Sequence, residues 1–236
     1  MPAELFQIGV SYQFVPTDIF KILNQSVMAS FSVDYDILTA SEGFKSKAYV
    51  PVCTQKSITN NNPVCKGKTV GDVIGKSGTT IGAGVDLGQM NEYDLNKLKL
   101  PPHLFFTLKP YLGVKGTKAL ELEELELMEI DARILSNKVK DSIITKIVNQ
   151  YEKDSKRNFN DLSMNIQTAI ADYFYQFGPS SMLKAPHKVL WEMIIKGEWQ
   201  KAAEFLVTQK DYKKRRVVEA NLILQSDEMK PSFKLP

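Results

Sequence analysis

The sequence contains few residues that could bind a metal ion or form disulfide bonds. Its 236 residues include two cysteines, Cys53 and Cys65, and two histidines, His103 and His187. The histidines are too far from the cysteines in the sequence to complete a zinc site. We therefore expect neither a metal nor a cofactor. The cysteines are either free thiols or a disulfide that closes a hairpin loop, and the sequence leaves both open.

A long apolar run is also missing. No stretch approaches the ~18–20 apolar residues that cross a bilayer, so we expect no membrane insertion. No basic residue precedes Lys21, and no apolar core followed by small residues occurs near the start, so we expect no secretory signal peptide. We expect synthesis in the cytoplasm, and release by another route if the protein acts outside the cell that makes it.

Neither sign of charge is in large excess. The formal net charge is +3, which is too small to predict a nucleic-acid partner. A mild positive balance would help only weakly on an anionic cell wall. The length and the 43% hydrophobic content predict one large domain, alone or with an appendage. We expect a monomer.

The spacing of apolar residues changes along the chain and predicts an α+β fold. Helical spacing predicts a short helix over residues 19–31 and another over residues 33–44 that ends at Gly43. Turn-forming residues dominate residues 45–88, which predicts a small irregular β region. Only helical patterns follow, so helices and strands are segregated. These later helices are expected over residues 117–151, 163–177, 186–196 and 213–224, with Gly178 and Gly197 at helix ends.

These patterns divide the chain into three parts. Residues 1–34 form an N-terminal appendage in which we find no catalytic or binding motif. This appendage would either pack on the main domain or act in delivery or docking of the protein. Residues 35–226 form the main domain, and residues 227–236 form a C-terminal tail.

The stretch GTTIGAGVDLG, from Gly78 to Gly88, has four glycines in eleven residues. The spacing of Gly82, Gly84 and Gly88 is one residue longer than a dinucleotide-binding GxGxxG, and no clear strand and helix flank it. Nucleotide binding is therefore disfavoured. Composition alone favours a strand and turn whose glycines adopt positive φ.

The stretch SEGFKSKAY, from Ser41 to Tyr49, places Glu42 at the end of an expected helix. A carboxylate there is unfavourable for the helix dipole, although a solvated surface glutamate would explain it too. SEGF, Tyr49 and TIGAG, taken together, resemble the phage-type lysozymes, which cut the sugar backbone of peptidoglycan. In that family a Glu-Gly pair ends the first helix, a Tyr follows seven residues later, and TIGxG lies in a small β lobe.

The C-terminal half is similar to the same family. DYFYQFG, from Asp172 to Gly178, resembles the helix that floors the cleft and ends in Gln-x-Gly. WEMIIKGEWQKAAEFL resembles the next helix pair, and RRVVEANLI, from Arg215 to Ile223, resembles the last helix. The matches occur in family order over roughly residues 35–225. The resemblance implies a small β lobe and a larger helical lobe, joined by a long helix, with the active-site cleft between them.

The resemblance also implies a catalytic set. Glu42 would be the general acid, which must hold its proton near neutrality through burial in the cleft. Many phage lysozymes place an Asp nine residues after the Glu, but that position is Pro51. Asp86 instead lies six residues after Thr80. This arrangement is similar to that of the pesticin-like muramidases, in which the Asp also follows the Thr of the TIG motif. Asp86 would activate water and Thr80 would orient it, in an inverting reaction with the carboxyl groups ~6.5–9.5 Å apart.

Further residues follow from the same resemblance. Arg215 would form an ion pair with Glu42, with a solvated basic helix face as the alternative. Gln176 would touch substrate or only form a hydrogen bond at the helix end. The resemblance implies substrate contacts by Tyr49, Gly82, Gly84 and Gln176. Trp191, Trp199, Phe174 and Phe177 fit the core better than sugar-stacking platforms.

The expected function is hydrolysis of the β-1,4 bond between N-acetylmuramic acid and N-acetylglucosamine, in the periplasm or cell wall of a host or target bacterium. An endolysin, a bacteriocin and an injected antibacterial effector all use such enzymes, and the last two would have an immunity protein as partner. Three alternatives are a lytic transglycosylase, a chitinase-like glycan cleaver and a non-catalytic peptidoglycan-binding module.

Overall fold

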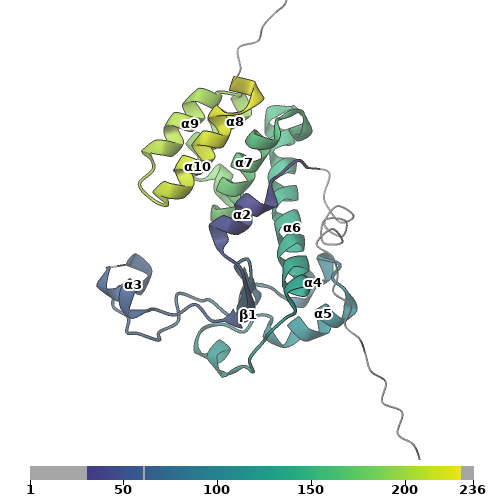
Figure 1. Cartoon of the computed structure of the whole chain (residues 1–236), viewed down its shortest axis with the longest axis vertical. Helices are drawn as coiled ribbons and strands as arrows, with labels where there is room; N and C mark the ends of the chain where they lie inside the picture. The colour runs from purple at the N-terminus through teal and green to yellow at the C-terminus, as the bar shows by residue number, and fades with distance from the viewer. Residues whose placement is uncertain (1–30, 61, 230–236) are drawn as a thin grey trace, which may run out of the picture. The chain divides into compact units, whose positions relative to one another are not determined.

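The computed structural model describes residues 31–60 and 62–229, in which a small sheet is followed by helices (Figure 1). The helix expected over residues 19–31 lies outside these residues except for Phe31. The first described helix, α2 (Tyr35–Glu42), begins where the Asp34 carboxylate accepts backbone N–H groups. It ends at Gly43, whose φ of 74° suits glycine, and this confirms the predicted end.

Three strands form one antiparallel sheet in the order β1-β2-β3. They are β1 (Lys45–Tyr49), β2 (Thr80–Gly82) and β3 (Val85–Asp86). Tyr49 lies opposite Thr80, and Thr80 lies opposite Asp86. Because residues directly opposite one another share a face of a sheet, the three residues form a row across it.

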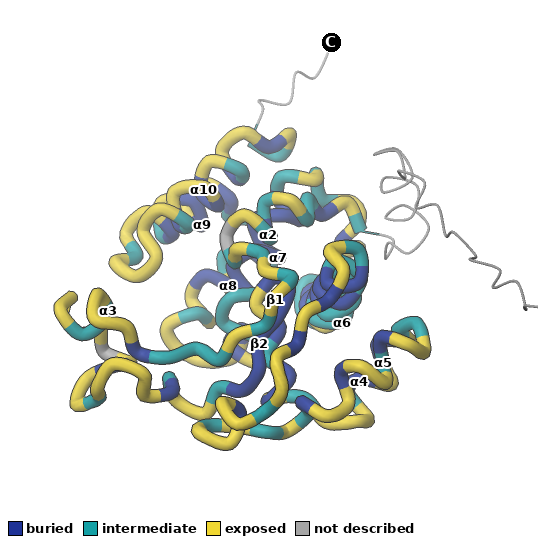
Figure 2. Tube along the Cα trace, turned by 60° about the horizontal axis from the view of Figure 1, so that its bottom comes forward, coloured by how far each residue is buried: buried dark blue, intermediate teal, exposed yellow. Residues whose placement is uncertain are grey.

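The loop between β1 and β2 carries helix α3 (Gln55–Thr59) and a disulfide. Cys53 and Cys65 are bonded, with their Cα atoms 5.7 Å apart, so the free-thiol alternative does not hold. Among the described residues, neither hydrophobic cluster of the protein includes a residue of this loop. Figure 2 shows the chain around α3 as mostly exposed. The loop therefore depends on its disulfide and a few backbone hydrogen bonds.

Replacing both cysteines with serine is expected to loosen this loop without unfolding the rest. Closing a loop of this length stabilises it by about 3 kcal/mol, so cleavage by a protease between residues 54 and 64 should become roughly a hundredfold faster. The main thermal transition should change little, because the hydrophobic clusters lie elsewhere. Limited proteolysis followed by mass spectrometry measures the first effect and calorimetry the second. Equal cleavage rates would contradict the prediction.

The long helix is shorter than the sequence predicts. A helix was expected over residues 117–151, but α6 spans Glu129–Ser155. Residues 122–128 are extended and pair with β1: Ala48 N–H donates to Leu125 O, and Leu127 N–H donates to Ser46 O. Leu125 and Leu127 are buried and their neighbours are exposed, which is strand periodicity. Pairing with the edge of β1 has overridden the helical spacing.

The other three expected helices, over residues 163–177, 186–196 and 213–224, are all present, with bounds within one residue of the prediction. Gly178 and Gly197 lie at helix ends with positive φ, as predicted. No helix in residues 31–60 and 62–229 combines the length and apolar character needed to cross a membrane. The elements are α4 (Glu92–Lys97), α5 (Pro102–Leu108), α7 (Met164–Phe177), α8 (His187–Lys196), α9 (Trp199–Thr208) and α10 (Lys213–Leu224).

Two hydrophobic clusters form the core, and α6 contributes to both. Its N-terminal half supplies Ala132 and Leu135 to a cluster with the sheet, α4 and α5. Its C-terminal half supplies Ile144 and Tyr151 to a cluster around α7 and α8. Figure 1 shows α6 running from the sheet to these helices. The second cluster includes Trp191, Trp199 and Phe174, with Phe177 packed against it, as expected of core residues.

The ends of the described chain pack on the helices. Val33 is buried in the cluster around α7, and Phe31 packs against that cluster. Glu228 accepts hydrogen bonds from the backbone N–H and hydroxyl of Ser163, immediately before α7. Residues 31–34 and 227–229 are therefore structurally part of the main domain.

Candidate functional site

Glu42 is the last residue of α2 and forms an ion pair with α10. Its Oε1 accepts a hydrogen bond from Nη1 of Arg215 over 2.6 Å, and its side chain is 25% exposed. A carboxylate at a helix C-terminus is disfavoured by the helix dipole, so a cationic partner stabilises it there. The contact implied by the family resemblance is present, and the alternative of a solvated basic face is wrong because Arg215 is mostly buried.

Arg215 is itself held by a second carboxylate that the sequence did not reveal. Its Nε donates to Oδ2 of Asp172 over 2.9 Å and its Nη2 donates to Oδ1 over 2.8 Å. Asp172 lies on α7 with no exposed side-chain surface. This two-point contact fixes the guanidinium plane and leaves Nη1 for Glu42. An aspartate among the apolar residues of DYFYQF was the available signal.

Gln176 also has a structural partner. Its Oε1 accepts a hydrogen bond from Nη2 of Arg216. Arg216 is buried, lies 2.9 Å from Glu219 and stacks on the ring of Tyr173. These contacts orient the Gln176 amide at the end of α7. Gln176 still lines both cavities described below, so the hydrogen bond and the expected substrate contact are compatible.

Glu42 and Asp86 face one cavity of about 310 Å³, although they come from different elements. The loop between β2 and β3 brings Gly84 opposite Glu42: a Cβ at Gly84 would lie 3.7 Å from Glu42 Oε2. The structure thus brings the expected general acid and general base together. The cavity is lined by Glu42, Gly84, Val85, Asp86, Gln89, Met90, Val139, Ile143, Tyr175 and Gln176.

Backbone N–H groups fix the Asp86 carboxylate. Oδ1 accepts from the backbone N–H groups of Gly78 at 3.0 Å and Gly88 at 2.9 Å. Oδ2 accepts from the side-chain Nε2 of Gln89 at 3.3 Å. A Cβ on Gly78 would lie 2.6 Å from the Cα of Gly88, so any side chain would separate the two donors. These two glycines are therefore needed for close backbone approach.

Gly82 and Thr80 are less accessible than the sequence led us to expect. Gly82 is buried against α6, where a Cβ would lie 2.2 Å from Ser136 Oγ, so the expected substrate contact of Gly82 does not fit its position. Thr80 is 4% exposed, and its hydroxyl donates to the carbonyl of Gly78. Thr80 is nevertheless the direct cross-strand partner of Asp86.

Two tyrosines lie close enough to Glu42 for its charge to raise their pKa. Burial raises the pKa of Tyr49, and the charges of Glu42 and Asp86 raise it further. Burial also raises the pKa of Tyr175, with Glu42 adding to the effect and Arg215 opposing it. Tyr175 lines the cavity and was missed by the sequence analysis. Its position directly before Gln176 was the available signal.

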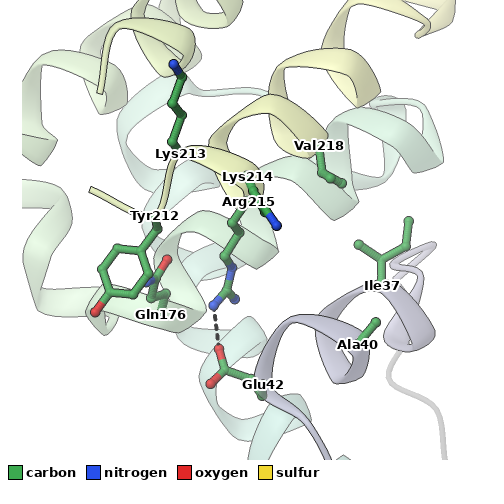
Figure 3. Close-up of a pocket in the computed structure, with 9 residues that line it drawn as sticks. All are labelled: Ile37, Ala40, Glu42, Gln176, Tyr212, Lys213, Lys214, Arg215 and Val218. Atoms are coloured by element: carbon green, nitrogen blue, oxygen red, sulfur yellow. Dashed lines mark hydrogen bonds and ion pairs between the residues drawn. The ribbon is translucent and has the colours of Figure 1, made fainter. Parts of the chain in front are cut away.

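A second cavity of about 880 Å³ also has Glu42 in its lining. Figure 3 shows Glu42 directed at Arg215 between α2 and α10. Glu42 and Gln176 line both cavities. The second cavity is lined by Ile37, Ala40, Glu42, Gln176, Tyr212, Lys213, Lys214, Arg215 and Val218. Within the described part of the chain, no group of three or more His, Cys, Asp or Glu residues is placed to hold a metal ion.

Comparison with known proteins identifies the family. The Pesticin family, described as a bacterial toxin homologue of phage lysozyme, C-terminal part, matches residues 32–200. A search of curated proteins finds no match to the chain. The matched range includes α2 with Glu42, the whole sheet with Asp86, and α7 with Asp172. Because the match covers most of the sequence, the chain belongs to the pesticin family of phage-lysozyme-like bacterial toxins.

Proposed function

We propose that the chain is a muramidase that hydrolyses the β-1,4 bond between N-acetylmuramic acid and N-acetylglucosamine. The observation that carries the proposal is the pair of carboxyl groups, Glu42 and Asp86, that face one cavity from α2 and from the sheet. Glycoside hydrolysis needs two such groups, one on each side of the scissile bond. Membership of a family homologous to phage lysozyme supports the same chemistry.

Each carboxyl group takes one role. Glu42, protonated, donates its proton to the glycosidic oxygen as the bond to the anomeric carbon breaks. Asp86 accepts a proton from a water molecule whose oxygen attacks that carbon from the opposite face. The hydroxyl of Thr80 turns from Gly78 to orient this water. Inversion of the anomeric centre follows, with the carboxyl groups ~6.5–9.5 Å apart.

The surrounding elements support this assignment. The glycan strand occupies a cleft between the sheet and the helices, with α6 joining the two lobes. Gly84, Tyr49 and Gln176 contact the sugars. Gly84 suits this role because its backbone is exposed opposite Glu42. Asp86, fixed by backbone N–H groups, needs no rearrangement before the reaction.

The toxin family supports a biological setting for this activity. The protein acts as a monomer on peptidoglycan in the periplasm or wall of a target bacterium, and an immunity protein protects the cell that makes it. The family description supports this setting over that of an endolysin.

Purified sacculi test the proposal. The expected result is release of new reducing ends at N-acetylmuramic acid, detected by reductive labelling and mass spectrometry. Products with a 1,6-anhydro ring would indicate a lytic transglycosylase. Reducing ends at N-acetylglucosamine would indicate another glycosidase. Binding without release would indicate a non-catalytic module.

A further inference from the structure

A buried lysine lies beside the helix end that carries Glu42, and no step of the proposed hydrolysis uses it. Lys140 lies on α6 and has no exposed surface. Its Nζ donates a hydrogen bond to Oγ1 of Thr39, three residues before Glu42. None of the ion pairs found among residues 31–60 and 62–229 involves Lys140. Burial of such a cation is costly, so its presence needs a reason.

The charge of Lys140 suits the end of α2. That helix has no basic residue in its last turn and ends on a carboxylate, which the helix dipole disfavours. Arg215 supplies one cation there from α10, and Lys140 supplies a second from α6. Burial lowers the pKa of Lys140 to about 8, and Glu42 is the charge that most opposes this lowering. Asp36 and Asp141 also oppose it, whereas Arg133 adds to it. Lys140 is therefore an ammonium ion at neutral pH.

Two adjacent turns of α6 hold the two sides of the site. Ser136, one turn before Lys140, accepts a hydrogen bond from the N–H of Ala83 between β2 and β3. Lys140 binds Thr39 on α2. The first contact fixes the loop that precedes Asp86, and the second fixes the helix turn that carries Glu42. One rigid helix thus sets the position of both carboxyl groups.

We propose that Lys140 is a positioning residue for Glu42, whose buried ammonium group holds the last turn of α2 against α6 and keeps the carboxyl group directed at the cavity. This inference rests on the proposed function and extends it. Lys140 is not one of the side chains that line the cavity, so it acts through Thr39 and Glu42 rather than on substrate.

The first test compares Lys140→Met with Lys146→Met, which removes an exposed lysine from the same helix. Lys140→Met should lower kcat on sacculi about tenfold or more while KM changes less than twofold, because a misplaced acid slows only the chemical step. The alkaline limb of the pH profile should move to higher pH, because wild type loses the proton of the Lys140 ammonium group above about pH 8 and the variant has no such proton to lose. The Tm should stay equal or rise, because a buried charge is replaced by an apolar group. Lys146→Met should change none of these.

Two results would overturn the proposal. One is an unchanged kcat and alkaline limb in Lys140→Met. The other is a lower kcat with a lower Tm and an unmoved limb, which indicates a purely structural role. If Lys140→Met does not fold, Thr39→Val decides. This variant should lower kcat and leave the alkaline limb of the pH profile unchanged, because it removes the hydrogen-bond acceptor and keeps the cation. An unchanged kcat overturns the proposal.

A readout without activity separates this proposal from the proposed function. The N–H of Gly43 donates to Thr39 O over 2.9 Å, so its hydrogen exchange reports on the end of α2. Exchange should be faster in both Lys140→Met and Thr39→Val than in wild type. If wild type releases no reducing ends, the muramidase proposal fails and this measurement still tests the positioning. Unchanged exchange in both variants overturns the positioning.

Discussion

Replacing Glu42 with glutamine is expected to lower the release of reducing ends from sacculi by about 10²–10⁴-fold, because the amide has no proton to give the leaving oxygen. KM should change little, since the amide occupies the same space at the cavity. The assay is reductive labelling of new ends, with muropeptide masses identifying the bond cut.

The fold should survive this change. Arg215 keeps its two-point contact with Asp172, and the glutamine amide oxygen still accepts from Nη1. An unchanged Tm would show that the lost rate comes from chemistry and not from unfolding. Glu192→Gln, on an exposed helix face, is the matched control and should keep full activity. Activity retained in Glu42→Gln would remove Glu42 from the mechanism.

The end of α2 shows how far the sequence could predict this site. Gly43, directly after Glu42, predicted the residue at which the helix ends. This was possible because a helix end of this kind depends on the backbone conformation of one position. The pairing of Glu42 with Arg215 joins residues 173 positions apart and came from family resemblance alone. No local pattern encodes such a contact.

Buried charges were the least predictable part of the site. Asp172 and Lys140 are fully buried, yet each lies in a helix where a charged residue usually faces solvent. Their positions in the helical repeat of the sequence do not distinguish them from charged residues on the surface of the helix. The apolar neighbours of Asp172 are a weak signal in the sequence, but the packing of α7 and α6 against neighbouring elements is needed to show that both side chains face inward.

The segment before α6 shows the same limit for the fold. Leu120 and Leu127 fit helical spacing with the residues that follow, so a single helix was predicted. Leu120 is 50% exposed and Leu127 is buried beside β1. Hydrogen bonds to a strand about 80 residues earlier decided the conformation, and local spacing carries no information about that strand.

Replacing Asp86 with asparagine is expected to lower hydrolysis by about 10²–10⁴-fold, because the amide cannot accept a proton from water. The side-chain oxygen of asparagine can still accept from Gly78 and Gly88, so the loop should keep its shape. Reducing-end release and Tm are measured together. Asp86→Ala is the structural comparison. It loses all three hydrogen bonds of the carboxylate, so its Tm should fall where that of Asp86→Asn does not.

The Asp86→Asn variant distinguishes hydrolysis from lytic transglycosylation. In a transglycosylase the sugar's own hydroxyl attacks the anomeric carbon, so no residue needs to activate water, and Asp86→Asn would remain active. Full activity in this variant would therefore reject water activation by Asp86, even with Glu42 essential.

The anomer of the first product then distinguishes the two roles that an essential Asp86 could have. A base that activates water leaves room for that water and gives the α-anomer from a β-linked strand. A nucleophile needs the two carboxyl groups ~5–5.5 Å apart and gives the β-anomer. Proton NMR during the first minutes of digestion resolves the two before mutarotation. Because Gly78 and Gly88 hold Asp86 from the backbone, while Glu42 is held by Arg215 on a different element, the spacing is set by the fold. We expect the α-anomer.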